Sequence, residues 1–255
     1  MLDELQYRIL RKISPAEPQA MSGSAYDERS KVAVSLGDAF LTSIHDKTVI
    51  DFGCGEGMAT LDLARHGAKK VIGIDVRQNV LDRANRNAAD AGLSGTCEFT
   101  TATDTKADAI ISLDAFEHFG DPAAILSIMH KLLKPDGYVL ASFGPTWYHP
   151  LGGHLFSVFP WAHLVFSEAA LIRWRSHVRN DGATRFSEVD GGLNQMTLAR
   201  FEKLVAASPF RIEKLEAVPI RSLRHLHSRL TREFTTAIIR TKLVRRDRVS
   251  EPLAA

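Results

Sequence analysis

Cysteine is scarce in this sequence, because the chain of 255 residues holds only Cys54 and Cys97. Their spacing matches no metal-ligand pattern, and two cysteines cannot form a disulfide framework. The sequence also lacks any run of eighteen apolar residues, and Asp3 and Glu4 interrupt its start, so it predicts neither a membrane span nor a secretion signal. We therefore expect a cytoplasmic protein whose cysteines are reduced and buried.

The sequence also has no large excess of charge of either sign, since its net charge is +2. Charged residues make up 24% of the chain and hydrophobic residues 45%. This composition predicts one substantial α/β core with room for elaboration. Residues 211–255 hold eleven Lys or Arg against five Asp or Glu, a net charge of +6, so the first 210 residues sum to −4. This basic tail lacks the interleaved aromatic residues of single-strand binders, which favours a solvated helix face over nucleic acid or an anionic membrane.

The most informative segment is an apolar strand, 49–52, that runs into three glycines at alternate positions, Gly53, Gly55 and Gly57. Glycines let the backbone turn sharply and come close to a ligand. The segment that starts at Met58 has the composition of a helix. This strand–turn–helix pattern predicts that a ligand lies across the strand ends.

Acidic residues around the turn narrow the choice of ligand. Asp75 ends the next strand, at the offset where a carboxylate accepts both hydrogen bonds of a ribose diol. Asp51 precedes the glycines and Glu56 lies among them, and both would repel a pyrophosphate, whereas they attract a cation. S-adenosylmethionine carries an ammonium, a sulfonium and a ribose diol but no phosphate, so it is the ligand that these charges favour.

At these residues the chain resembles the class I S-adenosylmethionine-dependent methyltransferases, whose first motif reads acid-x-Gly-x-Gly-x-Gly. Three further features extend the resemblance over about residues 45–145: Glu117-His118 after the strand 107–114, Asp121-Pro122 at a helix start, and Lys134-Pro135-Asp136-Gly137 before the strand 138–143. The resemblance implies an α/β fold with a doubly wound, seven-stranded, mostly parallel sheet. Its last two strands, expected at 210–218 and 233–243, would form an antiparallel pair.

The resemblance also implies which residues hold the cofactor. Asp51 would lie by the methionine end and Asp75 by the ribose. Relatives place an acidic residue near the adenine amine, and either Asp104 or Thr103 fills that role here. The expected cofactor-binding residues are Asp51, Gly53, Cys54, Gly55, Gly57, Asp75, Val76, Thr103, Asp104 and Leu113.

Four segments organise the chain. Residues 1–44 are expected to form an N-terminal helical lid, with one helix over 2–13, another over 32–40, and Tyr26 near the substrate. Residues 45–145 form the cofactor-binding core, 146–190 an insertion at the substrate site, and 191–255 the C-terminal part of the core sheet, with Thr197 at the start of a helix. A further helix is expected over 168–179.

The insertion begins with a loop rich in aromatic residues, glycines and histidines, at the sheet edge where open α/β folds bind ligands. Methyl transfer to oxygen or nitrogen needs alignment and a base, and histidine is the natural base near pH 7. We expect His154 or His149 to accept the proton. The predicted substrate contacts are Tyr26, Trp147, Tyr148, Phe156 and His163. Metal binding by the histidines is a weaker alternative, because acidic partners are sparse between 146 and 167.

Three functions remain open from the sequence. Methylation of a small molecule, on an oxygen or nitrogen of an aromatic or specialised metabolite, is favoured by the intact cofactor turn and the aromatic insertion. Methylation of RNA or protein is suggested by the basic tail and by Arg173-Trp174-Arg175, but the Asn-Pro-Pro-Tyr-type turn is absent where Leu113-Asp114-Ala115-Phe116 stands. A protein that keeps the cofactor without transferring its methyl is the third, since a fold does not fix a chemistry. The sequence leaves the oligomeric state open.

Overall fold

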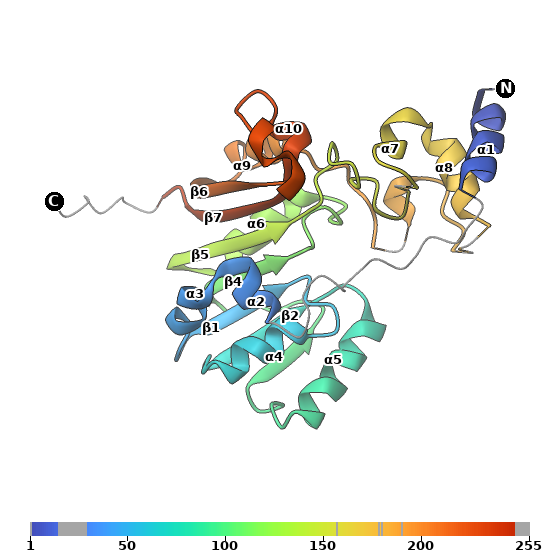
Figure 1. Ribbon diagram of the computed structural model, residues 1–255. Helices are drawn as coiled ribbons and strands as arrows, with labels where there is room; N and C mark the ends of the chain where they lie inside the picture. The colour runs from blue at the N-terminus through green and yellow to red at the C-terminus, as the bar shows by residue number, and fades with distance from the viewer. Residues whose placement is uncertain are drawn as a thin grey trace.

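The computed structural model describes residues 2–14, 30–156, 158–177, 179, 181–189 and 191–247. Its centre is a seven-stranded sheet with the order β3-β2-β1-β4-β5-β7-β6 (Figure 1). The strands are β1 (Thr48–Phe52), β2 (Lys70–Ile74), β3 (Cys97–Thr100), β4 (Ala107–Leu113), β5 (Leu133–Phe143), β6 (Phe210–Pro219) and β7 (Thr236–Arg245). The first five pair in parallel, and β7 pairs antiparallel with both β5 and β6. This topology confirms the predicted fold class.

Helices cover both faces of the sheet, as in other doubly wound folds. The longer helices are α1 (Leu2–Ile13), α2 (Lys31–Leu36), α3 (Asp38–Ser43), α4 (Met58–Arg65), α5 (Gln78–Asp90), α6 (Pro122–Leu132), α8 (Glu168–Arg175) and α9 (Leu198–Ala206). Residues of α2 to α5 pack on one face of the sheet, around Val49, Val71 and Ile111. Helices α6 and α9 pack on the other, around Ile110 and Phe143. Cys54 and Cys97 are free thiols, and Cys97 is buried.

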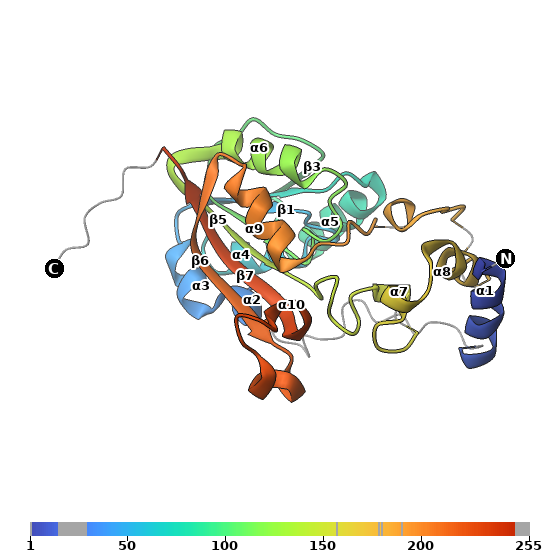
Figure 2. The ribbon, with the colours of Figure 1, turned by 90° about the horizontal axis from the view of Figure 1, so that it is seen from above.

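A lobe lies beside the sheet and is built from both ends of the insertion and from α1 (Figures 1 and 2). It contains η2 (His154–Phe156), α7 (Ala162–Val165), α8 and η3 (Phe186–Glu188). Its core holds Leu10 from α1 together with Phe156, Leu171, Trp174 and Phe186. Helix α1 therefore packs on the insertion. The lid prediction for residues 1–44 remains a prediction.

Local signals located most element starts, and several boundaries differ from expectation. Gly37, with φ at 89°, ends α2 and caps α3, so the helix predicted over 32–40 is two short helices. Strand β7 begins at Thr236, because Glu233 belongs to α10 (Arg232–Thr235). Strand β5 begins at Leu133, since residues 134–137 continue the strand beside β4 with an irregular register.

Helix α8 ends at Arg175, short of the predicted Arg179. The Arg175 guanidinium donates two hydrogen bonds of 2.6 Å to the Asp181 carboxylate. Within the described residues, no helix is long and apolar enough to cross a membrane.

Candidate functional site at the carboxyl ends of the strands

The three glycines of the turn after β1 all have positive φ angles, which favour glycine over other residues: Gly53 at 83°, Gly55 at 53° and Gly57 at 82°. Their surroundings differ. A Cβ atom on Gly53 would lie 2.7 Å from the Cβ of Ala115, and one on Gly57 would lie 2.6 Å from the Phe99 ring. A Cβ on Gly55 would meet nothing within 4 Å. Gly53 and Gly57 thus allow close packing, whereas Gly55 faces open space in which a ligand fits.

Asp75 follows β2 directly and is hydrogen-bonded to the turn. Its Oδ2 accepts from the Gly55 backbone N–H at 3.0 Å, which fixes the carboxylate beside the glycines. The backbone N–H and the guanidinium of Arg77 also donate to Asp75, at 3.0 to 3.3 Å. Burial by itself would raise the pKa of Asp75, but the hydrogen bonds from Arg77 and Gly55 hold it below its ordinary value. Asp75 is therefore ionised at neutral pH.

Asp51 lies inside the turn, with 2% of its surface exposed. Its Oδ2 accepts a hydrogen bond of 2.8 Å from Thr60, which ties β1 to α4. Burial raises the pKa of Asp51 to about 6, against the opposing influence of Thr60 and of the Lys31 charge. The Thr60 hydrogen bond and the Lys31 charge do not offset the burial of this carboxylate, so a cationic ligand would stabilise its ionised form.

The other predicted cofactor residues surround the turn. Val76 is 87% exposed, an unusual position for an apolar side chain next to a buried carboxylate. Cys54 lies in the turn, and burial raises the pKa of its thiol. Leu113 is buried at the end of β4. Thr103 and Asp104 lie in the coil after β3, where the Thr103 hydroxyl accepts from the Thr105 backbone N–H at 3.2 Å, and the choice between them stays open.

Sequence reasoning missed a group of charged side chains just after β4. Asp114 has a φ of 52° and forms a 3.0 Å ion pair with Lys31 of α2. Glu117 is 2% exposed, and its Oε1 accepts from the Gly144 backbone N–H at 3.2 Å. Burial raises the pKa of Glu117 to about 8, so this side chain is largely protonated at pH 7. Its position in the Glu-His motif was the available signal.

The structure places His154 beside His118, with ring centroids 5.2 Å apart. The His154 Nε2 is buried and has no hydrogen-bond partner among the described residues. Burial, and then the neighbouring imidazoles, lower the pKa of His154 to about 4, so the ring is neutral near pH 7. His118 Nδ1 lies 2.8 Å from the Gly192 carbonyl oxygen, which joins the turn after β4 to the segment that follows the lobe.

The other two histidines of the loop hold the loop itself together. His149 Nδ1 accepts from the Leu151 backbone N–H at 2.9 Å, and burial lowers its pKa to about 4. His163 is buried, and its Nε2 lies 2.6 Å from the Trp147 carbonyl oxygen. A Cβ on Gly153 would lie 2.6 Å from the Cβ of His163, so this glycine makes room for His163.

The predicted aromatic walls are spread over two regions. Phe156 is 1% exposed and packs in the core of the lobe, so it does not form the open wall expected from its sequence position. Trp147 packs edge-on against His163 and contacts Phe186. Tyr148 stacks on Phe234, near α10, with centroids 5.0 Å apart. Tyr26 lies outside the described residues.

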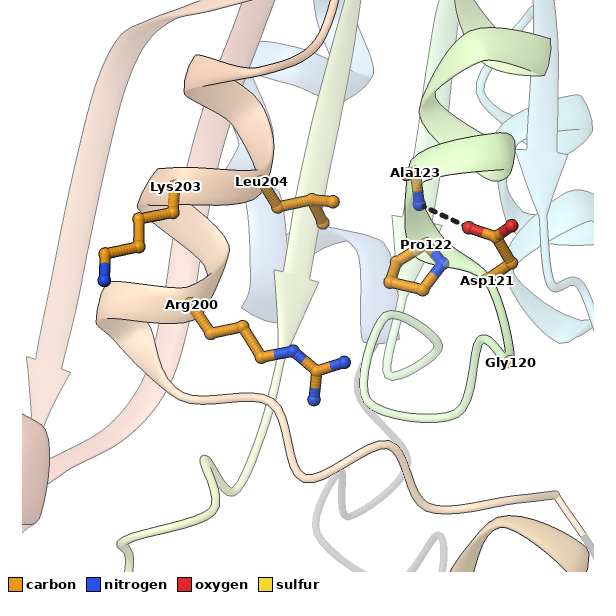
Figure 3. Close-up of a pocket in the computed structure, with 7 residues that line it drawn as sticks. All are labelled: Gly120, Asp121, Pro122, Ala123, Arg200, Lys203 and Leu204. Atoms are coloured by element: carbon orange, nitrogen blue, oxygen red, sulfur yellow. Dashed lines mark hydrogen bonds between the residues drawn. The ribbon is translucent and has the colours of Figure 1, made fainter.

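Two hollows lie near these groups. One, of about 420 Å³, separates the start of α6 from α9 and holds none of the predicted site residues (Figure 3). The other, of about 320 Å³, lies between the core and the lobe and has His118, Phe119, Phe186, Arg185 and Arg200 on its walls. His118, on the wall of the second hollow, also contacts His154, which is not itself on that wall. In the described part of the chain, no group of three or more His, Cys, Asp or Glu side chains is arranged to hold a metal ion.

The glycine turn lies at the carboxyl end of β1, in the middle of the parallel part of an α/β sheet. Residues 50–141 match the family described as methyltransferase domain. The ubiquinone biosynthesis O-methyltransferase of Neisseria meningitidis serogroup A is 37% identical over 103 residues, which cover 38% of this chain and 43% of that protein. The mitochondrial enzyme of the same name from Dictyostelium discoideum is 32% identical over 109 residues, covering 37% and 34%. The chain thus spans less than half the length of these curated relatives.

Solved structures agree on the fold. An S-adenosylmethionine-dependent methyltransferase from Mesorhizobium loti superposes with a TM-score of 0.53 at 18% identity, covering 82% of this chain and 95% of that one. Magnesium protoporphyrin IX methyltransferase from Synechocystis PCC 6803, solved with bound S-adenosylmethionine, gives 0.50 at 19% identity, covering 81% and 75%. The match of residues 50–141 to a methyltransferase domain and the fold shared with these structures agree with the resemblance found in the sequence.

Proposed function

We propose that this protein transfers the methyl group of S-adenosylmethionine to a hydroxyl oxygen of a small-molecule acceptor. The observation that carries the proposal is the Asp75 carboxylate held against the Gly55 N–H, beside the open space in front of Gly55. The curated relatives are O-methyltransferases by name, which favours oxygen over nitrogen as the acceptor atom.

The residues of the turn fit this cofactor. Asp75 is ionised and lies where a ribose diol would donate two hydrogen bonds, and the exposed Val76 side chain next to it offers apolar surface to an adenine. Asp51 lies in the same turn, and its buried negative charge favours a ligand with an ammonium and a sulfonium. When bound, the cofactor supplies an electrophilic methyl group on a sulfonium.

The acceptor side is supported by the groups after β4. The hollow between core and lobe has the size of a small ligand and reaches His118. His154 is neutral near pH 7 and has a free ring nitrogen, so it can take the hydroxyl proton while the new C–O bond forms. Glu117 is largely protonated at that pH, which leaves His154 as the candidate base in this group.

A panel of phenolic and catecholic acceptors, offered with S-adenosylmethionine and analysed by mass spectrometry, tests the proposal. We expect at least one acceptor to gain a methyl group, and His154→Gln to lower kcat by about 10²–10³-fold with little change in KM for the cofactor. His45→Gln, at a histidine whose side chain is 72% exposed, is the matched control and should keep full activity. Label that appears in RNA or protein substrates, and in none of the small molecules, would contradict the proposal.

A further inference from the structure

The connection between β6 and β7 projects from the end of the sheet as a tip, formed by residues 220–235 (Figure 2). It contains the 3-10 helix η4 (Arg221–Leu226), which has no buried residue, and α10. Large apolar side chains on this β6–β7 tip face solvent: Leu230 is 94% exposed, Leu226 53% and Phe234 49%. Apolar side chains gathered on a small projection indicate a surface that binds a partner or a membrane.

The β6–β7 tip is also strongly basic. Arg221, Arg224 and Arg229 are exposed, and among the described residues none of them takes part in a salt bridge. The acidic residue of the tip, Glu233, is engaged elsewhere, because its carboxylate accepts from backbone N–H groups at the start of α9. Arg232 pairs with Glu202 at 2.8 Å. Three guanidinium groups therefore lie on the same tip as the exposed leucines, and no carboxylate of the described residues pairs with them.

This pattern separates the tip from the rest of the basic C-terminal region. Arg245 bonds to Asp247 and to the His130 carbonyl, and Arg246 donates to the carbonyl oxygens of Ser208 and Ala206. The charges at the end of the sheet are thus used within the fold. Arg221, Arg224 and Arg229 on the tip have no such partner among the described residues.

We propose that the β6–β7 tip docks on an anionic lipid surface. The exposed leucines would enter the interfacial region, and the three arginines would lie among lipid phosphates, a combination typical of interfacial membrane binding. Nucleic acid would leave Leu226 and Leu230 uncovered, and the aromatic ring at the tip, Phe234, is already stacked on Tyr148. The same stacking holds the tip against the loop after β5, so docking keeps that loop near the lipid surface.

Co-sedimentation of the full chain with vesicles tests the proposal. We expect the protein to sediment with vesicles of phosphatidylcholine mixed with phosphatidylglycerol, weakly with phosphatidylcholine alone, and less as salt rises. Replacing Arg221, Arg224 and Arg229 by Gln should weaken binding roughly fivefold for each arginine. Leu226→Ser with Leu230→Ser should weaken it by roughly tenfold or more.

Matched substitutions elsewhere give the controls. Arg86→Gln on α5 and Ile128→Ser on α6 change an exposed arginine and an apolar side chain that is 43% exposed, and they should bind vesicles as the unaltered protein does. Helix α1 also exposes apolar side chains, so Leu5→Ser with Ile9→Ser measures a rival surface.

Four results would each overturn the proposal: no sedimentation with anionic vesicles, unchanged binding by the tip variants, loss of binding in the α1 variant alone, or binding of an oligonucleotide in place of vesicles. All the altered side chains are at the surface, so we expect every variant to fold. Circular dichroism of each variant checks this and separates a folding defect from lost binding.

Discussion

Gly55 and Gly57 are two positions apart in one turn, and the structure gives them different tasks. Both have positive φ, but only Gly57 is packed against Phe99 and Ala84, while Gly55 faces open space. Gly55→Ala should cost about 1–2 kcal/mol of stability, the price of the left-handed backbone, and should weaken cofactor binding more than tenfold.

Gly57→Ala is the comparison for this prediction. Its Cβ would also meet the Phe99 ring at 2.6 Å, so the loss of stability should be larger, about 3 kcal/mol. Urea unfolding gives both stabilities, and titration with S-adenosylhomocysteine gives both affinities. Equal loss of stability in the two variants, with normal binding by Gly55→Ala, would place the ligand elsewhere.

Glu117 makes the free energy of unfolding fall as the pH rises towards 8. Its pKa rises from 4.5 in the unfolded chain to about 8 in the fold, so the folded state binds more protons than the unfolded state between these values. The stabilisation is complete below pH 4.5 and is lost as the pH rises through 8. Between pH 6 and 8 Glu117 should by itself lower the free energy of unfolding by about 1 kcal/mol per pH unit.

Glu117→Gln should remove this contribution, as measured by urea unfolding of both proteins across that range. Asp51, whose pKa rises from 3.8 to about 6, also makes stability fall with pH up to about 6, whereas His149 and His154, whose pKa values fall from 6.5 to about 4, make it rise up to about 6.5. These groups are present in both proteins, so the quantity that tests Glu117 is the difference in slope between the variant and the unaltered protein. An unchanged slope in Glu117→Gln would show that another group titrates on unfolding.

Residues could be assigned from sequence where local pattern decides their position. Asp75 was found because it ends a strand at a fixed offset from the glycines, and the structure places it against Gly55. Phe156 was placed wrongly, because a fully buried aromatic and a pocket wall have the same composition signal, and the contact with Phe186 that buries it comes from a distant segment. The role of Gly153 depends on His163 in the same way.

At the scale of elements, the start of α9 is capped from two sides. The Thr197 hydroxyl accepts from the Arg200 backbone N–H at 3.1 Å, and the Glu233 carboxylate accepts from Leu198 and Ala199 at 3.2 and 2.7 Å. Thr197→Ala should cost about 1 kcal/mol and Glu233→Gln about 1–2 kcal/mol, because a charge at a helix N-terminus adds to its hydrogen bonds.

Thermal or urea unfolding of the two single variants and the double variant tests this capping. The double variant should lose somewhat less than the sum, since both caps act on one helix end. Glu213→Gln, at a carboxylate that pairs only with Lys242 on neighbouring β7, is the control and should change stability by less than 1 kcal/mol. A Glu233→Gln variant as stable as this control would contradict the capping role.

The same helix shows why element boundaries were only partly predictable. Thr197 is a local cap signal and located α9, as Asp121 and Pro122 located α6. Glu233 was placed in the last strand, because its partners lie more than thirty residues earlier in the chain and leave no local pattern. Only tertiary structure shows that it serves another helix.

At the scale of the whole molecule, the predicted sheet is confirmed, with its parallel strands and the antiparallel β7. The lobe beside it was predicted only as an insertion, and its packing with α1 was not foreseen, because contacts between Leu10 and residues near 171 link distant parts of the chain. The family match covers residues 50–141 and leaves the lobe outside it. The lobe is therefore where we look for the features that select the acceptor.

The most direct test of cofactor binding at the glycine turn is isothermal titration calorimetry with S-adenosylmethionine, S-adenosylhomocysteine and NAD, on the unaltered protein and on Asp75→Ala. We expect the first two ligands to bind at one site and NAD not to bind. Asp75→Ala should weaken binding by about 1–3 kcal/mol, the scale of a lost charged hydrogen bond. NAD binding of comparable affinity, or unchanged affinity in Asp75→Ala, would contradict this site.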